Sequence, residues 1–342
     1  MASKFRKIAF SIFKYSITLG IAAFLLWYVY RDLSFDELLK QFDDINYDWI
    51  VFSIVLALLS HYLRAYRWNI LLEPLGYKLK TNRTFIAVMV GYFANNLVPR
   101  LGEVTRCGIL KKNDGVAITS AFGSVVAERA LDLLTLIVIA SITFFIEFDK
   151  INHFVIENFQ NKIPNTESIY GLVFAGLGIL IVFGIGLIVV LKLFREKLHR
   201  NPWYLKARQF IKELLDGFLS IRKIENQTGF WISTLGIWGL YYSMLIVVFF
   251  AFPPTSNLSL LAGLTLLIMS GLGMSAPVQG GIGVFHILVS GMLVLYGISV
   301  EDGKVFALVA HTTQFLTIMF FGGISFIVSV FMKSKPSYVI SK

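Results

Sequence analysis

Long apolar segments alternate with short polar ones along the chain, and this pattern predicts membrane-spanning helices. A helix needs about 20 mostly apolar residues to cross a bilayer. Six segments meet this length: Phe10–Tyr30, Trp49–Leu72, Ala117–Ile146, Ile169–Leu191, Phe230–Phe252 and Val305–Met332. The first is long for the apolar part of a signal peptide and ends in aromatic residues, so we expect a retained span.

Two further apolar regions are interrupted by proline and glycine. Thr84–Val98 runs into a break at 99–103, and Leu258–Ser275 runs into a break at 277–283 that is followed by Val284–Tyr296. Both breaks carry the pattern P-x-x-G. Interrupted helices are tolerated at membrane depth where they are buried in protein or line a polar cavity, and paired interruptions point to a transporter site. We predict two re-entrant helical hairpins in an inverted repeat; the alternative is that one or both regions are ordinary kinked spans.

The distribution of basic residues sets the orientation. If both termini are cytoplasmic and the hairpins enter from opposite sides, 22 of the 31 Lys and Arg residues lie inside and five outside. Cytoplasmic loops carry such an excess. We therefore expect an all-α polytopic protein of the cell inner (cytoplasmic) membrane, with about six full spans, two broken hairpins and both termini inside. Segment 201–228 is typical of an amphipathic helix that lies at the cytoplasmic interface, rather than of a separate soluble domain. We therefore expect residues 1–342 to form a single integral membrane domain.

Composition excludes several other classes of protein. The chain is 56% hydrophobic and only 15% charged, whereas soluble domains carry about 25% charged residues. An ordinary cytosolic enzyme, a disordered chain and a collagen-like fibre are excluded. The net charge of +10 fits basic loops that face anionic lipid better than it fits a nucleic-acid partner, which we do not expect. The single cysteine, Cys107, allows no internal disulfide.

Ionisable residues inside apolar segments are costly, so they are the first candidates for function. Arg64 and Arg67 are spaced i, i+3 towards the cytoplasmic end of the second span. A guanidinium offers two parallel donors to a phosphate, which makes a phosphate a natural partner. The alternative is that both arginines snorkel to the interface beside Trp68 as an anchor.

A second charged group lies at the start of the third long segment. Glu128 and Asp132 are one helical turn apart and flank Arg129, which leaves a net negative charge in apolar surroundings. These acids are expected to recruit another cation from Arg64, Arg67, Arg100 or Arg106. The alternative is a structural ion-pair network that fixes helix packing.

The two breaks supply the remaining candidates for a headgroup path. The first break combines amides, a glycine and charges. An anion bound at the start of the following helix would accept hydrogen bonds from free backbone N–H groups. The alternative is that this break is an ordinary surface loop. Its residues are Asn95, Asn96, Pro99, Arg100, Gly102, Glu103 and Arg106. The second comprises Pro277, Gln279, Gly280, Gly281 and Gly283, with His311 and Gln314 of the last span placed to face it. No metal-ligand spacing, nucleophile motif or phosphate loop occurs, so we predict no catalytic residue, metal or cofactor.

These stretches resemble the lysylphosphatidylglycerol synthase transmembrane-region family, also called flippase-like domain proteins. The resemblance is carried by 64–68, by N-N-x-x-P-x-x-G-E-x-x-R at 95–106, by Glu128-Arg129 with Asp132, and by 277–283. It implies a bacterial or archaeal membrane domain that moves lipids between leaflets. In bifunctional members a soluble aminoacyl-transfer domain follows. Here the chain ends ten residues after the last predicted span, so lysyl transfer is not expected.

Two positions depart from the family pattern. A glutamate is frequent just after the glycine-rich break, where this chain has His286, and an arginine is common in the last span, where it has His311 or Gln314. The overall expectation is a non-enzymatic translocator of an anionic phospholipid or another phosphate-bearing lipid. The alternatives are a membrane-embedded lipid-modifying enzyme and a structural or regulatory partner of a cell-envelope enzyme. Self-association into a homo-oligomer and an envelope-lipid enzyme partner are further expectations.

Overall fold

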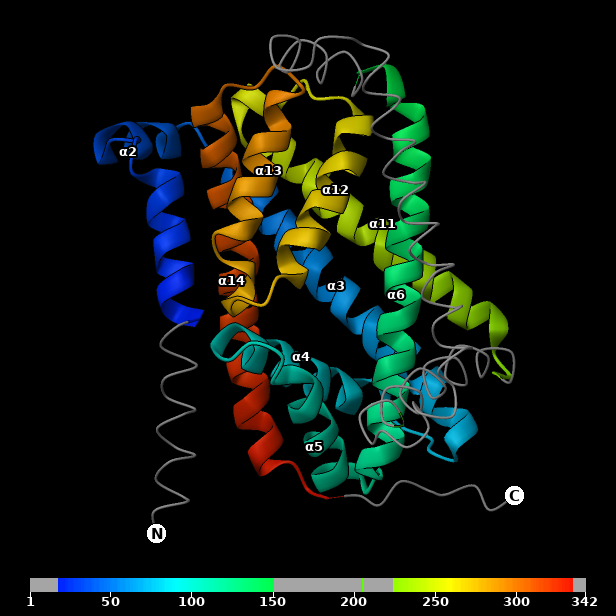
Figure 1. Ribbon diagram of the computed structural model, residues 1–342. Helices are drawn as coiled ribbons and strands as arrows, with labels where there is room; N and C mark the ends of the chain where they lie inside the picture. The colour runs from blue at the N-terminus through cyan, green and yellow to red at the C-terminus, as the bar shows by residue number, and fades with distance from the viewer. Residues whose placement is uncertain (1–17, 151–204, 206–223, 335–342) are drawn as a thin grey trace. The chain divides into compact units, whose positions relative to one another are not determined.

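The computed structural model describes residues 18–150, 205 and 224–334, and the elements within these ranges are helices (Figure 1). A first helix is described over Thr18–Tyr30. The longer helices that follow are α2 (Phe35–Asp43), α3 (Tyr47–Leu72), α4 (Thr81–Leu97), α5 (Gly102–Asp114), α6 (Ile118–Ile146), α11 (Gln227–Ala251), α12 (Leu260–Ser275), α13 (Val284–Val294) and α14 (Val300–Phe331). Short 3₁₀ helices lie at η1 (Glu73–Leu75), η3 (Pro253–Thr255) and η4 (Gln279–Gly281). The all-α expectation is confirmed.

The chain divides into two compact units, 1–143 with 220–342, and 144–219. Most of the second unit lies outside the described residues, and the following description concerns the first. The described residues also exclude the predicted span Ile169–Leu191 and most of the predicted interfacial helix at 201–228. The prediction of a single membrane domain therefore stays a prediction.

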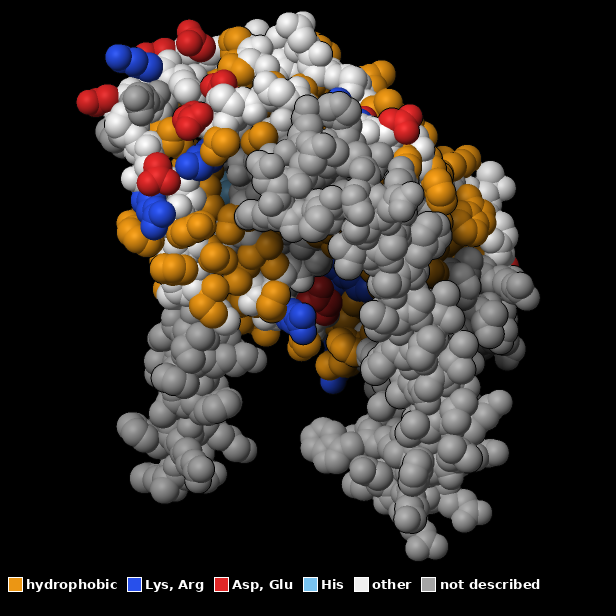
Figure 2. All heavy atoms as spheres, turned by 45° about the horizontal axis from the view of Figure 1, so that its top comes forward, with side chains coloured by type: hydrophobic (Ala, Val, Ile, Leu, Met, Phe, Trp, Pro, Cys, Tyr) orange, Lys and Arg blue, Asp and Glu red, His pale blue; other side chains and the backbone are white. Residues whose placement is uncertain are grey.

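Four helices are long and apolar enough to cross a membrane: Tyr47–Leu75, Ile118–Ile146, Gln227–Ala251 and Val300–Phe331. They confirm four of the six predicted spans, and the predicted first span is described only from Thr18. Between 17% and 44% of each apolar window is buried, so most of this apolar surface faces outward, as lipid contact requires. Figure 2 shows apolar side chains over much of the described surface on one face.

The first interrupted region is an antiparallel hairpin of α4 and α5. At its open end Arg83, in the first turn of α4, forms an ion pair with Asp114, the last residue of α5. Near the break, Gly91 of α4 lies against Gly102 at the start of α5. Both helices are shorter than a full span, at 17 and 13 residues.

The second interrupted region is also a hairpin, formed by α12 and α13. Gly273 lies against the backbone of Phe285 near the break, and the hydroxyl of Tyr296 donates to Oγ1 of Thr265 over 2.7 Å at the open end. The helices have 16 and 11 residues. Both regions are therefore hairpins rather than kinked spans, whereas the sides from which they enter the bilayer stay a prediction.

The two breaks meet: in Figure 1 the lower end of the α12–α13 hairpin lies beside one end of α4. The short helix η4 packs on α4, and a Cβ at Gly280 would lie 3.3 Å from Oδ1 of Asn96. His311 of α14 donates from Nε2 to the carbonyl oxygen of Gly280 over 2.7 Å. Gly280 has a φ of 54°, a left-handed conformation that favours glycine. His311 thus joins the tip of the α12–α13 hairpin to α14, and Gly280 of that tip lies against Asn96 of α4.

The close approach at Gly102 gives a test of the first hairpin. In Gly102→Ala the new Cβ would overlap the carbonyl oxygen of Gly91 and the amide of Asn95. Since backbone atoms cannot yield as a flexible side chain does, we expect a loss of about 1–3 kcal/mol in the free energy of unfolding. Thermal unfolding in detergent measures it. Gly108→Ala, on the same helix with nothing within 4 Å, is the control and should leave stability unchanged or raised; equal melting temperatures for the two variants would contradict the packing.

Candidate functional site

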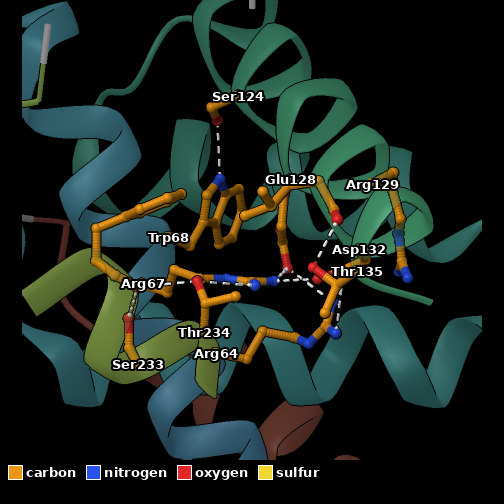
Figure 3. A network of polar contacts seen from close by, with 12 residues as sticks. Arg64, Arg67, Trp68, Ser124, Glu128, Arg129, Asp132, Thr135, Ser233 and Thr234 are labelled. Carbon is orange, nitrogen blue, oxygen red and sulfur yellow. Dashed lines mark hydrogen bonds and ion pairs between the residues drawn. The ribbon is translucent and has the colours of Figure 1, made fainter. Parts of the chain in front are cut away.

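The centre of the site is the carboxylate of Glu128, which lies on α6 and has no exposed surface. Arg64 of α3 donates from Nη1 to Oε1 over 2.7 Å, and Arg67 donates from Nη2 to the same oxygen over 3.4 Å. Arg106 of α5 places Nη1 2.9 Å from Oε2. Figure 3 shows the arginines of α3 directed at this carboxylate. Three guanidinium groups from two helices therefore share one buried acid.

Asp132 extends the network one turn further along α6. Its Oδ1 accepts from Nη2 of Arg67 over 2.7 Å, and its Oδ2 lies 3.0 Å from Nη2 of Arg64. The i, i+4 spacing of the acids places both on one face of α6, opposite the i, i+3 pair on α3. Nη1 of Arg67 also donates to Oγ1 of Thr234 on α11 over 3.5 Å. The network consequently links α3, α5, α6 and α11.

Snorkelling of the α3 arginines is excluded by this geometry. Arg64 is 3% exposed and Arg67 has no exposed surface, because both side chains are directed at the acids of α6. The expected recruitment of cations is correct for Arg64, Arg67 and Arg106. Arg100, the fourth available supplier, is exposed and forms no ion pair with the described residues. Arg100 has a φ of 63°, a left-handed conformation that is uncommon outside glycine, and its side chain is exposed in the turn of the break.

Aromatic rings surround the arginines. The guanidinium of Arg106 lies 4.6 Å from the ring centroid of Trp68, whose Nε1 donates to Oγ of Ser124 over 2.8 Å. Arg64 lies about equally far from Tyr92 and Tyr241, at 6.0 and 5.9 Å. Such rings stabilise a cation where water is excluded.

Sequence reasoning missed these roles. It interpreted Trp68 as an interface anchor, whereas the side chain is fully buried. The tyrosines were not singled out at all. The one available signal is that Tyr92 precedes Asn95 by one helical turn and so shares a face with it.

A second ion pair lies at the exposed edge of the network. Nη2 of Arg129 is 3.2 Å from Oε1 of Glu103, and their side chains are 43% and 25% exposed. Figure 3 shows Arg129 on a different side of α6 from its neighbour Glu128. This pair is thus the more exposed part of the cluster, whereas the ion pairs of Glu128 are buried.

A small pocket separates the buried network from this edge. It is lined by Val88, Gly91, Tyr92, Asn95, Gly102, Glu103, Arg106 and Arg129. Arg106 is 3% exposed, yet its Nε and Nη2 have no hydrogen-bond partner among the described residues. Oε2 of Glu103 is also buried without a partner. The cavity volume is about 10 Å³, which is room for about one water molecule. Arg129 and Glu103 both line this cavity, so their ion pair forms part of its wall.

The first break contributes differently from what the sequence predicts. Oδ1 of Asn95 accepts from the backbone N–H of Gly102 over 2.6 Å, so this first N–H of α5 is not available to an anion. Asn96 is 7% exposed, and its Nδ2 has no partner among the described residues. Pro99 belongs to the turn at the hairpin tip, between α4 and α5.

The second break supplies a polar surface facing Asn96. Gln279 is 8% exposed and its Oε1 has no partner within the described part of the chain. Of the two predicted partners on α14, His311 contacts the break, whereas no hydrogen bond is formed by Gln314 with the described residues. Pro277 is exposed. The backbone of the break turns through left-handed conformations, with positive φ at Gly280, Gly281 and Gly283.

His286 is a further residue of this break. Its Nδ1 accepts from the backbone N–H of Gly283 over 3.2 Å, which caps the start of α13. Its ring centroid lies 4.7 Å from that of His311. Within the described residues no group of three His, Cys, Asp or Glu is arranged to hold a metal ion.

The contribution of Glu128 to the free energy of unfolding can be measured directly. In Glu128→Gln the three arginines lose their shared charge while the side chain keeps its shape. Removing one partner of a buried ion pair costs about 3–5 kcal/mol, and we expect a loss of this size in unfolding free energy. Chemical unfolding in detergent micelles gives the value. Glu103→Gln, at the exposed edge, is the matched control and should cost at most about 1 kcal/mol; similar losses for both variants would show that Glu128 is not the centre.

Comparison with known proteins places the chain in a family. Relatives include the UPF0104 membrane protein MJ1595 of Methanocaldococcus jannaschii, 27% identical over 44% of this chain and 43% of the relative. Another is the UPF0104 membrane protein MJ1078 of the same organism, 26% identical over 68% of this chain and 93% of the relative. A third is named glycosyltransferase AglD, from Haloferax volcanii, 28% identical over 37% of this chain and 20% of the relative.

The matched part thus covers less than half the length of two of these relatives. No solved structure matches the chain significantly. Residues 15–322, which include α3 to α6, both hairpins and most of α14, match the family described as the lysylphosphatidylglycerol synthase TM region. The protein is therefore a multi-pass membrane protein that belongs to the family of the lysylphosphatidylglycerol synthase TM region.

Proposed function

We propose that this protein moves a phosphate-bearing lipid between the leaflets of a membrane. The observation that carries the proposal is the side chain of Arg106, which is buried while Nε and Nη2 have no partner among the described residues. A buried charge with unpaired donors is costly unless a ligand completes its hydrogen bonds. Two adjacent N–H groups of a guanidinium match two oxygens of a phosphate.

The position of this arginine supports translocation rather than simple surface binding. The pocket of Arg106 lies beside the α4–α5 break, and that break meets the break of the α12–α13 hairpin through Asn96 and Gly280. Gln279 and Asn96 add amide groups without partners at this meeting point. A headgroup can therefore pass from charged to neutral polar contacts. The acyl chains gain nothing in a polar groove and stay in the lipid.

The charged pair at the edge gives the pocket a means of opening. The cavity is too small for a phosphate as it stands. Separation of Arg129 from Glu103 would widen it and would leave the Arg129 guanidinium free to follow the anion inward. The network behind the pocket, centred on Glu128, would stay fixed during this movement because its charges are buried and paired.

The proposed location is the cytoplasmic membrane with both termini inside. This rests on the excess of Lys and Arg in the segments assigned to the cytoplasmic side. Lipids with a phosphate headgroup are abundant at that surface, and the same basic segments would hold them near the membrane.

A second candidate function is support of an enzyme that acts on envelope lipids. One relative is named a glycosyltransferase, and the region matching this chain makes up only 20% of its length. This arrangement suggests that a domain of this kind can work beside a transferase. The chain would then bind a lipid and present it to a partner.

The test is leaflet exchange in liposomes that contain the purified protein and a fluorescent anionic phospholipid. In Arg106→Gln two charged donors are lost, and since hydrogen bonds to charged groups contribute about 1.5–3 kcal/mol we expect exchange to fall about tenfold or more. Arg129→Gln, at the exposed edge, should also reduce exchange without the risk of misfolding that a buried change carries.

The control is Lys111→Gln, which removes one exposed charge from the same helix as Arg106. It should leave the exchange rate unchanged. Thermal unfolding of each variant shows whether it is folded. Unaltered exchange in folded Arg106→Gln and Arg129→Gln would refute a path through this pocket, and no exchange by the folded wild type would favour the second candidate.

A further inference from the structure

The charges of the network do not balance, and the imbalance specifies a class of headgroup. Ion pairs connect Arg64, Arg67 and Arg106 with Glu128 and Asp132, and a further pair at the pocket joins Arg129 to Glu103. The two groups together hold four guanidinium groups and three carboxylates. Arginine is always protonated in proteins, and each of these acids faces an arginine. One positive charge is therefore in excess.

The excess charge is localised at Arg106. Arg64 and Arg67 each contact both Glu128 and Asp132, whereas Arg106 contacts only Glu128, through Nη1. Its other donors, Nε and Nη2, are buried without partners among the described residues. Its guanidinium also lies 4.6 Å from the ring centroid of Trp68, which favours a cation but cannot neutralise it. The uncompensated charge thus belongs to the side chain that lines the pocket.

Exposed basic residues do not change this count. Arg100 lies within the α4–α5 break, in an exposed turn, and forms no ion pair with an acid of the network. Lys111 and Lys112 lie in the last turn of α5 and are exposed as well. The count is confined to those charges of the described residues that join the network or line its pocket.

We propose that the pocket selects a phosphodiester headgroup, with one negative charge on the phosphate, over a phosphomonoester with two. This inference rests on the proposed function and names its substrate class. A single negative charge brings the network and its ligand to neutrality. A phosphomonoester carries close to two charges above its second pKa of about 6. It would leave one negative charge in excess beside the buried carboxylate of Glu128.

Two lipids that differ by one methyl group test this selectivity. Phosphatidylmethanol is a phosphodiester and phosphatidic acid is the corresponding phosphomonoester, so their sizes are almost equal. Their charges differ by one when the pH is well above the second pKa of phosphatidic acid in the bilayer. Each is supplied with a fluorescent acyl chain in liposomes of an uncharged carrier lipid. We expect the wild type to exchange phosphatidylmethanol about tenfold faster or more, because an unbalanced buried charge is strongly unfavourable.

Charge-changing variants at the exposed edge then shift the preference in a defined direction. Glu103→Gln raises the excess charge to two and should favour phosphatidic acid. The double variant Glu103→Gln/Arg129→Gln returns the excess to one and should restore the preference for phosphatidylmethanol. Glu301→Gln, an exposed acid in the first turn of α14, is the control and should behave as the wild type.

A binding measurement separates this inference from the proposed function. Native mass spectrometry of the purified protein with equal amounts of both lipids gives a retention ratio that requires no transport. A preference for phosphatidylmethanol that reverses in Glu103→Gln supports the inference even if no lipid is exchanged, in which case translocation alone is wrong. Equal retention of both lipids, or a ratio that Glu103→Gln leaves unchanged, overturns the inference, although exchange itself would still support translocation.

Discussion

The buried carboxylate of Glu128 neutralises arginines from two other helices, and the positions of those helices depend on it. Arg64 and Arg67 come from α3 and Arg106 from α5, so one acid joins segments that lie up to 64 positions apart in the chain. A charge in such surroundings is tolerated only when it is paired, which makes the set interdependent. Asp132 also accepts a hydrogen bond from Arg67, and the ring of Trp68 packs on the guanidinium of Arg106.

This fixed centre gives the two hairpins different roles. The α4–α5 hairpin is attached to the network by Arg106 and is closed tightly where Gly91 lies against Gly102, since a Cβ at Gly102 would overlap the carbonyl oxygen of Gly91. The α12–α13 hairpin contacts it at the tip, and His311 holds that contact through a single backbone carbonyl. Buried charges thus stabilise one side of the meeting point, whereas glycine turns and neutral amides form the other. A polar path between the two would combine a rigid charged wall with a wall that can adjust.

Much of this arrangement could be predicted from the sequence, because membrane segments follow simple rules of length, polarity and charge. Four spans, both hairpins and the pairing of acids with Arg64, Arg67 and Arg106 follow from apolar runs, Pro and Gly breaks and the cost of buried charge. The errors concern tertiary geometry. Arg100 is exposed in a left-handed turn and forms no ion pair with the network, and Trp68 is fully buried rather than interfacial. Neither outcome could be read from spacing, since each depends on which helix packs opposite.

The central claim is that a lipid phosphate completes the hydrogen bonds of Arg106. The most direct measurement is cryo-electron microscopy of the protein in nanodiscs that contain phosphatidylmethanol, at a resolution that shows the phosphate group. The account predicts phosphate density within hydrogen-bond distance of Nε and Nη2 of Arg106, with Arg129 separated from Glu103. A map in which these atoms contact only protein or water, while lipid density stays on the outer apolar surface, would contradict it.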